Sequence, residues 1–203
     1  MEKMLDVVFI LDKSGSMSGS EDSTITSFNE YLERERKNNY KTRITTILFS
    51  DYYSYLYKGA DVSKVSLLTR DDYFVGGCTA LYDAIGSSIN YIDRCDTDKV
   101  LFIIITDGYE NASKEFDKEK IRRMIRNHSN YEFVYIGADI DSYSSGGSIG
   151  IKSDNIANFK KDRKGTNLLF KSVGDFESSM MEDSVSSSWK KDLDEYIDGY
   201  LDK

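Results

Sequence analysis

Several residue types are scarce in this sequence. Among its 203 residues there are no prolines, one histidine and two cysteines. Without proline, no slow prolyl isomerisation is expected to limit folding. The two cysteines, Cys78 and Cys95, make neither a disulfide framework nor a metal pattern, which predicts a reducing, cytoplasmic location. A serine hydrolase needs a base beside its nucleophile, and His128, predicted near an exposed helix end, is a poor candidate for that role.

Long apolar runs and excess positive charge are also missing. No stretch approaches the roughly twenty apolar residues that a membrane span requires. Asp6 interrupts the apolar run near the N-terminus, so we expect no signal peptide. The net charge of −8 argues against nucleic-acid binding, which requires a basic surface, and favours cations or basic partner surfaces. The phosphate-binding patterns G-x-x-x-x-G-K-[ST] and G-x-G-x-x-G do not occur.

The distribution of apolar residues predicts one α/β domain. The length and the composition, 39% hydrophobic and 31% charged, are typical of a soluble globular domain. Strands are predicted at residues 5–11, 43–49, 53–57, 99–106, 131–136 and 155–159. Helices are predicted to begin near Asp22, Thr79, Asp117 and Thr166, and residues 65–73 are ambiguous between a loop and a short helix. This alternation predicts a doubly wound, mostly parallel sheet flanked by helices.

Other segments carry weaker signals. The charged positions of the first helix, Glu35 among them, are predicted to face solvent. Residues 137–150 are rich in Ser and Gly and interrupt the pattern, and residues 160–165 form a basic turn. Residues 188–203 carry an apolar stripe at helical spacing. We expect this stripe to dock on a domain formed by residues 1–187; a partner-binding helix is the alternative.

Three separate segments carry oxygen-bearing side chains at predicted element ends. Asp12, Ser14 and Ser16 follow the first strand, Thr79 follows a pair of glycines, and Asp107 follows the strand at 99–106. Ligand sites in open α/β sheets lie at the carboxyl ends of the strands, so these side chains are expected at one edge. Oxygen ligands without imidazole or thiolate suit Mg²⁺, Mn²⁺ or Ca²⁺ rather than Zn²⁺ or Cu. The first segment alone would equally suit a flexible Ser/Gly turn.

Taken together, the three segments resemble those of a von Willebrand factor A-type (vWA) domain, and residues 76–85 and 106–113 resemble the stand-alone bacterial members. The resemblance covers about residues 5–176. It implies a Rossmann-like vWA fold with one short antiparallel edge strand. It also places five residues on the positions of the family's metal-ion-dependent adhesion site (MIDAS): Asp12, Ser14, Ser16, Thr79 and Asp107. Cys78 departs from the small residues that are usual beside the metal-site threonine.

The resemblance implies a protein-binding module that depends on a divalent cation. A Mg²⁺ ion, with Mn²⁺ and Ca²⁺ as alternatives, would be held by the hydroxyls directly and by the carboxylates through water. It would capture an Asp or Glu carboxylate of a protein partner, with no nucleic-acid or membrane partner and a chain that is monomeric alone. Asp83, Glu110 and Asn111 are expected at the rim, where they would shape partner choice. A solvated carboxylate at the helix start and plain loop solvation are the alternatives.

Two other functions stay open at this stage. A Mg²⁺-dependent phosphohydrolase with Asp12 as nucleophile is the catalytic alternative, because strand-end aspartates near Mg²⁺ are common in such enzymes. The second acid expected two residues later is Ser14 here, and the sequence identifies no lysine partner for the phosphate. The third candidate is a scaffold whose metal site is structural only. The sequence therefore favours a binding module over an enzyme.

Overall fold

The computed structural model describes residues 4–138 and 140–201, apart from the side chains of residues 200 and 201. Parts of the predicted segments 137–150 and 188–203 lie outside the described residues. Within the described chain, six strands form one sheet in the order β3-β2-β1-β4-β5-β6. The strands are β1 (Met4–Asp12), β2 (Lys41–Phe49), β3 (Tyr53–Asp61), β4 (Lys99–Thr106), β5 (Tyr131–Gly137) and β6 (Ile156–Asn158).

The sheet is parallel except at one edge. β1 pairs in parallel with β2 and β4, and β5 pairs in parallel with β4 and β6, whereas β3 is antiparallel to β2. This confirms the predicted doubly wound sheet with an antiparallel edge strand. The edge strand is longer than predicted, because it continues past residue 57 through a register shift beside Thr46. Gly59, at a φ of +55°, donates its N–H to Thr45 Oγ1 there, an arrangement that carries the strand on to Asp61.

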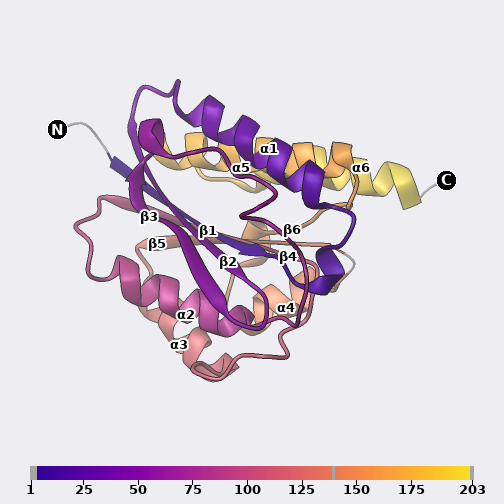
Figure 1. Ribbon diagram of the computed structural model, residues 1–203. Coiled ribbons are helices and arrows are strands. Elements are labelled where there is room, and N and C mark those ends of the chain that lie inside the picture. The colour runs from indigo at the N-terminus through magenta and orange to yellow at the C-terminus, as the bar shows by residue number, and fades with distance from the viewer. Residues whose placement is uncertain (1–3, 139, 202–203) are drawn as a thin grey trace.

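Helices cover both faces of the sheet. Figure 1 shows α1, α5 and α6 on one face and α2, α3 and α4 on the other. The helices are α1 (Glu21–Glu35), α2 (Leu81–Ile92), α3 (Lys118–Asn127), α4 (Ser142–Ser148), α5 (Arg163–Met181) and α6 (Lys191–Leu201). Short 3₁₀ helices are η1 (Gly15–Met17), η2 (Val62–Lys64), η3 (Ser153–Asn155) and η4 (Ser187–Lys190).

The central strand β1 contributes to two hydrophobic cores, one on each face of the sheet. Val7 and Phe9 belong to the core under α1 and α5, and Val8 and Ile10 to the core under α2 and α3. All four side chains are fully buried. Burial on both faces explains why β1 reads as an unbroken apolar run rather than an alternating one. The strand that ends at the candidate site is therefore held rigidly in the middle of the molecule.

Aspartate caps explain two helix starts that the sequence pattern missed. Asp141 accepts the backbone N–H of Ser144 at 2.9 Å, which starts α4 inside the Ser/Gly-rich segment. Asp162 accepts the N–H of Gly165 at 2.7 Å, so α5 begins before the predicted Thr166. Each cap acts through one local hydrogen bond. Such a bond adds no hydrophobic periodicity to the sequence, so the spacing of apolar residues does not reveal these helix starts.

Residues 65–73 form a loop rather than a helix. The Asn29 side chain on α1 donates to the Leu68 carbonyl at 2.9 Å and accepts the Leu68 N–H at 2.8 Å. These two bonds satisfy the backbone of an extended segment, which removes the need for helical hydrogen bonds there.

Glu35 does not face solvent as predicted. Its exposed fraction is 3%, and Glu177 of α5, with an exposed fraction of 0%, lies against it. The inner face of α1 extends to Glu35 because α1 and α5 pack along each other on the same side of the sheet.

The described part of the C-terminal stripe packs against the domain. Trp189 and Leu193 are buried, and the Trp189 ring meets Phe176 of α5 edge-on at 5.5 Å between centroids. Trp189 Nε1 also donates to the Asp154 carbonyl at 2.9 Å. A division of the chain after residue 187 stays a prediction. None of the described helices is both long enough and apolar enough to cross a bilayer.

Candidate metal centre

Two of the predicted site residues lie at the carboxyl ends of adjacent strands. Asp12 is the last residue of β1, and Asp107 directly follows β4. β1 and β4 are neighbours in the parallel part of the sheet. The chain leaves both strands at the same edge, so Asp12 and Asp107 lie near each other: the Asp12 carboxylate accepts the hydroxyl of Thr106, the last residue of β4, across a separation of 94 residues.

The Asp12 carboxylate is fully buried and held by two donors. Its Oδ1 accepts the Ser14 N–H at 2.6 Å, and its Oδ2 accepts the Thr106 hydroxyl at 2.5 Å. Burial raises the pKa of Asp12, these hydrogen bonds lower it, and the charge of Asp107 adds to the rise. The Tyr73 hydroxyl donates to the Asp12 carbonyl and fixes the backbone at the same point.

A chain of hydroxyl groups links the first loop to Asp107. Ser14 Oγ lies 3.0 Å from Ser16 Oγ, and Ser16 Oγ donates to Asp107 Oδ1 at 2.6 Å. The 3₁₀ turn η1 begins after Ser14 and sets the two serines two residues apart on the same side. The predicted Ser14, Ser16 and Asp107 therefore form one hydrogen-bonded group.

Thr79 reaches the same group from the loop before α2, which begins at Leu81 rather than at Thr79. A Cβ added at Gly108 would lie 2.8 Å from Thr79 Oγ1 and 3.3 Å from Ser16 Oγ. Both hydroxyls therefore border the same small space, which a side chain at position 108 would fill. Asn111 fixes the Thr79 backbone from both sides: its Oδ1 accepts the Thr79 N–H at 2.9 Å, and its own N–H donates to the Thr79 carbonyl.

The glycine pair before Thr79 lets its loop approach the first loop closely. Gly15 N–H donates to the Gly77 carbonyl at 3.0 Å. Gly77 has a φ of +83°, and a Cβ there would lie 2.0 Å from an Asp51 carboxylate oxygen, so only glycine fits. Asp51 accepts the Cys78 N–H at 3.1 Å, and a further hydrogen bond from the exposed Cys78 thiol to Asp51 raises the pKa of that thiol. Cys78 therefore helps to hold this loop in place through its hydrogen bonds to Asp51.

The structure adds a residue that the sequence reasoning missed. Lys161, in the turn between β6 and α5, places its Nζ 2.7 Å from Asp107 Oδ2 and 3.0 Å from the Ser16 carbonyl. Asp107 is thus held on one oxygen by the Ser16 hydroxyl and on the other by an ammonium group. The basic turn at 160–165 was visible in the sequence, but nothing local to it indicates which carboxylate it meets.

Asp83 and Glu110, two of the residues expected at the rim, both accept hydrogen bonds from neighbouring backbone groups. Asp83 is buried and accepts three backbone N–H groups, those of residues 114–116, so it is not a solvated carboxylate. Glu110 accepts the Tyr82 N–H at 2.9 Å and also binds residues 112 and 113. Together with Asn111, they hold the loop after β4 against α2. A partner-binding role for the three stays a prediction.

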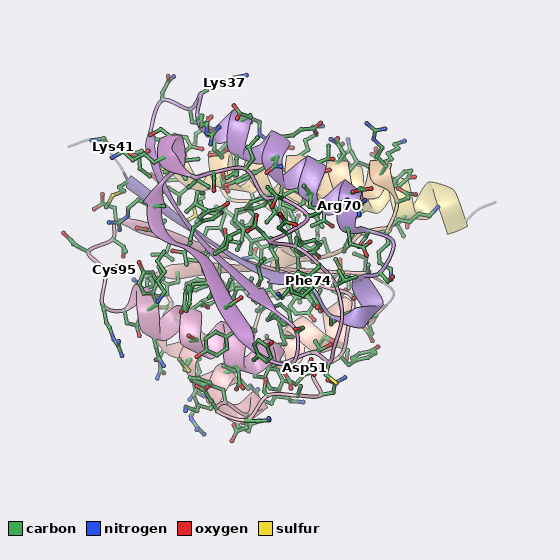
Figure 2. The ribbon with its side chains drawn as sticks, in the orientation of Figure 1. Lys37, Lys41, Asp51, Arg70, Phe74 and Cys95 are labelled. Atoms are coloured by element: carbon green, nitrogen blue, oxygen red, sulfur yellow. The ribbon has the colours of Figure 1, made fainter. Side chains whose placement is uncertain are left out.

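Three aromatic side chains stand exposed on the loops at this edge. Tyr52, Phe74 and Tyr109 are 73%, 64% and 59% exposed, the largest values among the large hydrophobic side chains of the described residues. Lys13, next to Asp12, places its ammonium 4.3 Å from the centre of the Phe74 ring. Figure 2 shows Phe74 and Asp51 right of the centre of the view, away from Lys41 and Cys95 at its left side. The surface beside the site therefore carries exposed aromatic rings.

The donor set fits a hard divalent cation. Hydroxyl and carboxylate oxygens converge here, and these are the ligands that Mg²⁺, Mn²⁺ and Ca²⁺ prefer. Over the described part of the chain, no group of three or more His, Cys, Asp or Glu side chains is arranged to hold a metal ion. A cation at this edge would therefore depend on the hydroxyl oxygens as well as the two carboxylates, which stay predicted ligands.

Comparisons with known proteins agree with this geometry at the level of the fold. Proximal thread matrix protein 1 from the mussel byssus has a TM-score of 0.64 at 15% identity, over 85% of this chain and 45% of that chain. The same protein with a zinc-occupied MIDAS motif has a TM-score of 0.63 at 17% identity, with the same coverage. A von Willebrand factor type A protein from Catenulispora acidiphila has a TM-score of 0.58 at 13% identity, over 83% of this chain and 41% of that chain.

The chain therefore spans less than half the length of these solved proteins. Among curated proteins, no sequence is significantly similar to it. The model of the von Willebrand factor type A domain matches residues 6–171, which is most of the chain and includes every predicted metal ligand. The chain belongs to the von Willebrand factor type A domain family.

Proposed function

We propose that this protein is a metal-dependent protein-binding module that captures an acidic side chain of its partner. Mg²⁺ would be held by Asp12, Ser14, Ser16, Thr79 and Asp107. The bound ion would supply a positive charge with an exchangeable coordination position, which a partner's Asp or Glu carboxylate completes. The observation that carries this proposal is the gathering of the Ser16 and Thr79 hydroxyls, from two different loops, beside Gly108 at a sheet edge, where Ser16 also donates to Asp107.

The aromatic surface beside the site supports a protein as the partner. Protein interfaces are enriched in tyrosine and phenylalanine at their centres, and large exposed apolar side chains are otherwise unfavourable on a soluble domain. Tyr52, Phe74 and Tyr109 come from three different loops around the site, so a partner segment that reaches the ion would also contact aromatic rings.

The solved relatives support a divalent cation at this place in the fold. The mussel protein carries zinc at its MIDAS motif, and this chain shares its fold but only 17% of its residues. The oxygen-only donor set of this chain favours Mg²⁺ or Mn²⁺ over Zn²⁺, so zinc is the competitor to include in any titration.

The positions of Lys161 and Asp12 both bear on the phosphohydrolase alternative. Lys161 supplies a cation at the site, but it lies on Asp107 and not on Asp12. The Asp12 side chain is fully buried and both of its oxygens accept hydrogen bonds from within the protein, which does not favour attack on an external phosphate. We therefore do not propose catalysis; turnover of a generic phosphomonoester that is lost in Asp12→Asn would reverse this view.

The first experiment is a calorimetric titration of metal-stripped protein with MgCl₂, MnCl₂ and ZnCl₂. We expect saturable binding at one site that Ser16→Ala and Thr79→Ala abolish. Ser18→Ala is the matched control, because Ser18 is exposed in the same loop two residues from Ser16. Equal binding by Thr79→Ala and the wild type would refute the proposed site.

The second experiment selects short random peptides on the immobilised protein in millimolar MgCl₂. We expect recovered peptides to be enriched in Asp or Glu beside an apolar residue, and the enrichment to vanish in EDTA and with Thr79→Ala. Metal binding without any metal-dependent peptide enrichment would instead favour a structural metal. In that case EDTA would lower the melting temperature and change no interaction.

A further inference from the structure

Lys161 occupies the cationic position of the candidate site from a distant part of the chain. Its Nζ contacts Asp107 Oδ2 at 2.7 Å and the Ser16 carbonyl at 3.0 Å. Ser16 Oγ donates to the other Asp107 oxygen at 2.6 Å. The Asp107 side chain is fully buried, so the ammonium is the positive charge that compensates it.

A divalent cation and the Lys161 ammonium need the same carboxylate. Asp107 is a predicted metal ligand, and with Asp12 it is one of two carboxylates at the site. Two positive charges within a few ångströms in a partly buried setting repel each other strongly. Binding of the ion therefore requires that the ammonium leave Asp107 or that its charge oppose the ion.

The structure provides a place for the displaced side chain. Lys161 also lines a cavity of about 720 Å³ between the N-terminal parts of α1 and α5. The wall of this cavity carries the carboxylates of Asp22, Glu30 and Asp162 together with the cationic side chains of Arg163 and Lys164. The lysine stem is half-buried and has four rotatable bonds, so side-chain rotation can carry its ammonium from Asp107 toward this cavity.

We propose that Lys161 is an internal competitor of the metal ion and sets its affinity. In the metal-free protein the ammonium neutralises Asp107 and joins it to the Ser16 loop. Cation binding displaces it toward the cavity that Asp22 and Glu30 border. This inference rests on the proposed metal-dependent function and adds the residue that tunes it.

The test measures Mg²⁺ affinity and thermal stability of Lys161→Gln beside the wild type. We expect Lys161→Gln to bind Mg²⁺ roughly tenfold more tightly, the scale on which residues behind metal ligands act. In EDTA the variant should melt at a lower temperature than the wild type, because Asp107 loses its counter-charge. Mg²⁺ should then raise its melting temperature by more than it raises that of the wild type.

Two further variants separate the contact from the general charge. Lys160→Gln removes a positive charge from the same turn, where Lys160 lies 3.3 Å from Asp162, and should leave Mg²⁺ affinity unchanged. Lys161→Arg retains a cation that can pair with Asp107 and should keep the wild-type affinity.

Each outcome has a distinct meaning. Equal or weaker Mg²⁺ binding by Lys161→Gln overturns the inference, and the proposed function then stands if Thr79→Ala still abolishes binding. An equal gain in Lys160→Gln also overturns it, because the effect would then be long-range. Absence of Mg²⁺ binding in the wild type and in Lys161→Gln overturns the inference and the proposed function together.

Discussion

Two pairs of buried carboxylates in this domain differ in the number of hydrogen-bond donors around them. At the candidate site, Asp12 accepts a hydroxyl and a backbone N–H, and Asp107 accepts a hydroxyl and an ammonium. Between α1 and α5, Glu177 accepts the Tyr31 hydroxyl at 2.7 Å and Glu35 accepts the Asn38 amide. The first pair is rich in donors, and the second is poor in them.

Few donors surround the carboxylates of Glu35 and Glu177. With both carboxylates ionised, Glu177 Oε2 would lack a hydrogen-bond donor, and we therefore expect the pair to share a proton. Burial raises the pKa of both groups, and each group's charge or hydrogen bond adjusts that of the other. The number of surrounding hydrogen-bond donors, rather than burial alone, therefore decides whether two buried carboxylates stay ionised and can bind a cation.

The largest effect should come from removing one acid of the helix pair. Both pKa values are raised in the folded state, so the stability that the pair contributes is present below pH 4.5 and is lost as the pH rises through the folded values. In Mg²⁺, the unfolding free energy of the wild type should fall by about 1.4 kcal/mol per pH unit in that window relative to Glu177→Gln. Urea unfolding at a series of pH values measures this.

Glu182→Gln is the control for that series. Glu182 is exposed at the C-terminus of the same helix, so its variant should keep the wild-type slope. Parallel slopes for the wild type and Glu177→Gln would contradict the shared proton.

Removal of the metal ion should lower the unfolding free energy through the site of Asp12 and Asp107 and leave the contribution of Glu35 and Glu177 unchanged. At a Mg²⁺ concentration one hundred times the dissociation constant, the ion should add about 2.7 kcal/mol to the unfolding free energy, because it binds the folded state only. Glu177→Gln should show the same gain as the wild type, and Thr79→Ala should show none. Urea unfolding with Mg²⁺ and with EDTA checks this, and a smaller gain in Glu177→Gln would mean that the two pairs are coupled.

Removal of one donor at the site should have a smaller effect. Thr106→Val deletes the hydroxyl that orients Asp12 Oδ2, and residues of this kind change metal affinity by roughly tenfold, or about 1.4 kcal/mol. Calorimetric titration with MgCl₂ measures the change. Thr46→Val is the control: Thr46 is buried on β2 without a hydrogen-bond partner for its hydroxyl, so its variant should retain full affinity. Equal affinities of Thr106→Val and the wild type would show that Asp12 needs no orienting donor.

The smallest effect should follow loss of the corresponding donor in the helix pair. Tyr31→Phe removes the hydroxyl bond to Glu177, which should cost about 1 kcal/mol and raise the pKa of Glu177 further, because that bond lowers it. The stability loss should therefore extend to higher pH, while Mg²⁺ affinity stays unchanged. Unfolding and titration of Tyr31→Phe, with the exposed Tyr52→Phe as control, test both parts. A change in Mg²⁺ affinity would be the contrary result.

The sequence predicts the fold well where its signals are local and strong. The apolar runs that end at Asp12 and at Thr106 each specify a central parallel strand, and the position of the polar residues after them follows from strand direction. For the same reason Asp12 and Asp107 are expected at one edge, and the structure brings them together there. Their roles as ligands stay predictions.

The features that the sequence did not reveal depend on contacts between distant segments. Lys161 looks like one of several lysines in a turn until the fold places it on Asp107. Glu35 fits a solvated helix face until α5 covers it with a second carboxylate. Asp83 looks like a helix-start carboxylate, but its three backbone donors come from a loop about thirty residues later in the chain. In each case the role of a charged side chain depends on its hydrogen-bond or ion-pair partner, and that partner lies on another helix, strand or loop.

The position of Lys161 in the chain also sets an order of events during synthesis. Asp107 leaves the ribosome 54 residues before the lysine that neutralises it. At ordinary translation rates that interval lasts roughly three to ten seconds. During that interval the Asp107 carboxylate lacks the Lys161 ammonium. If the proposed competition holds, a metal ion would therefore bind the nascent domain more readily than the finished one.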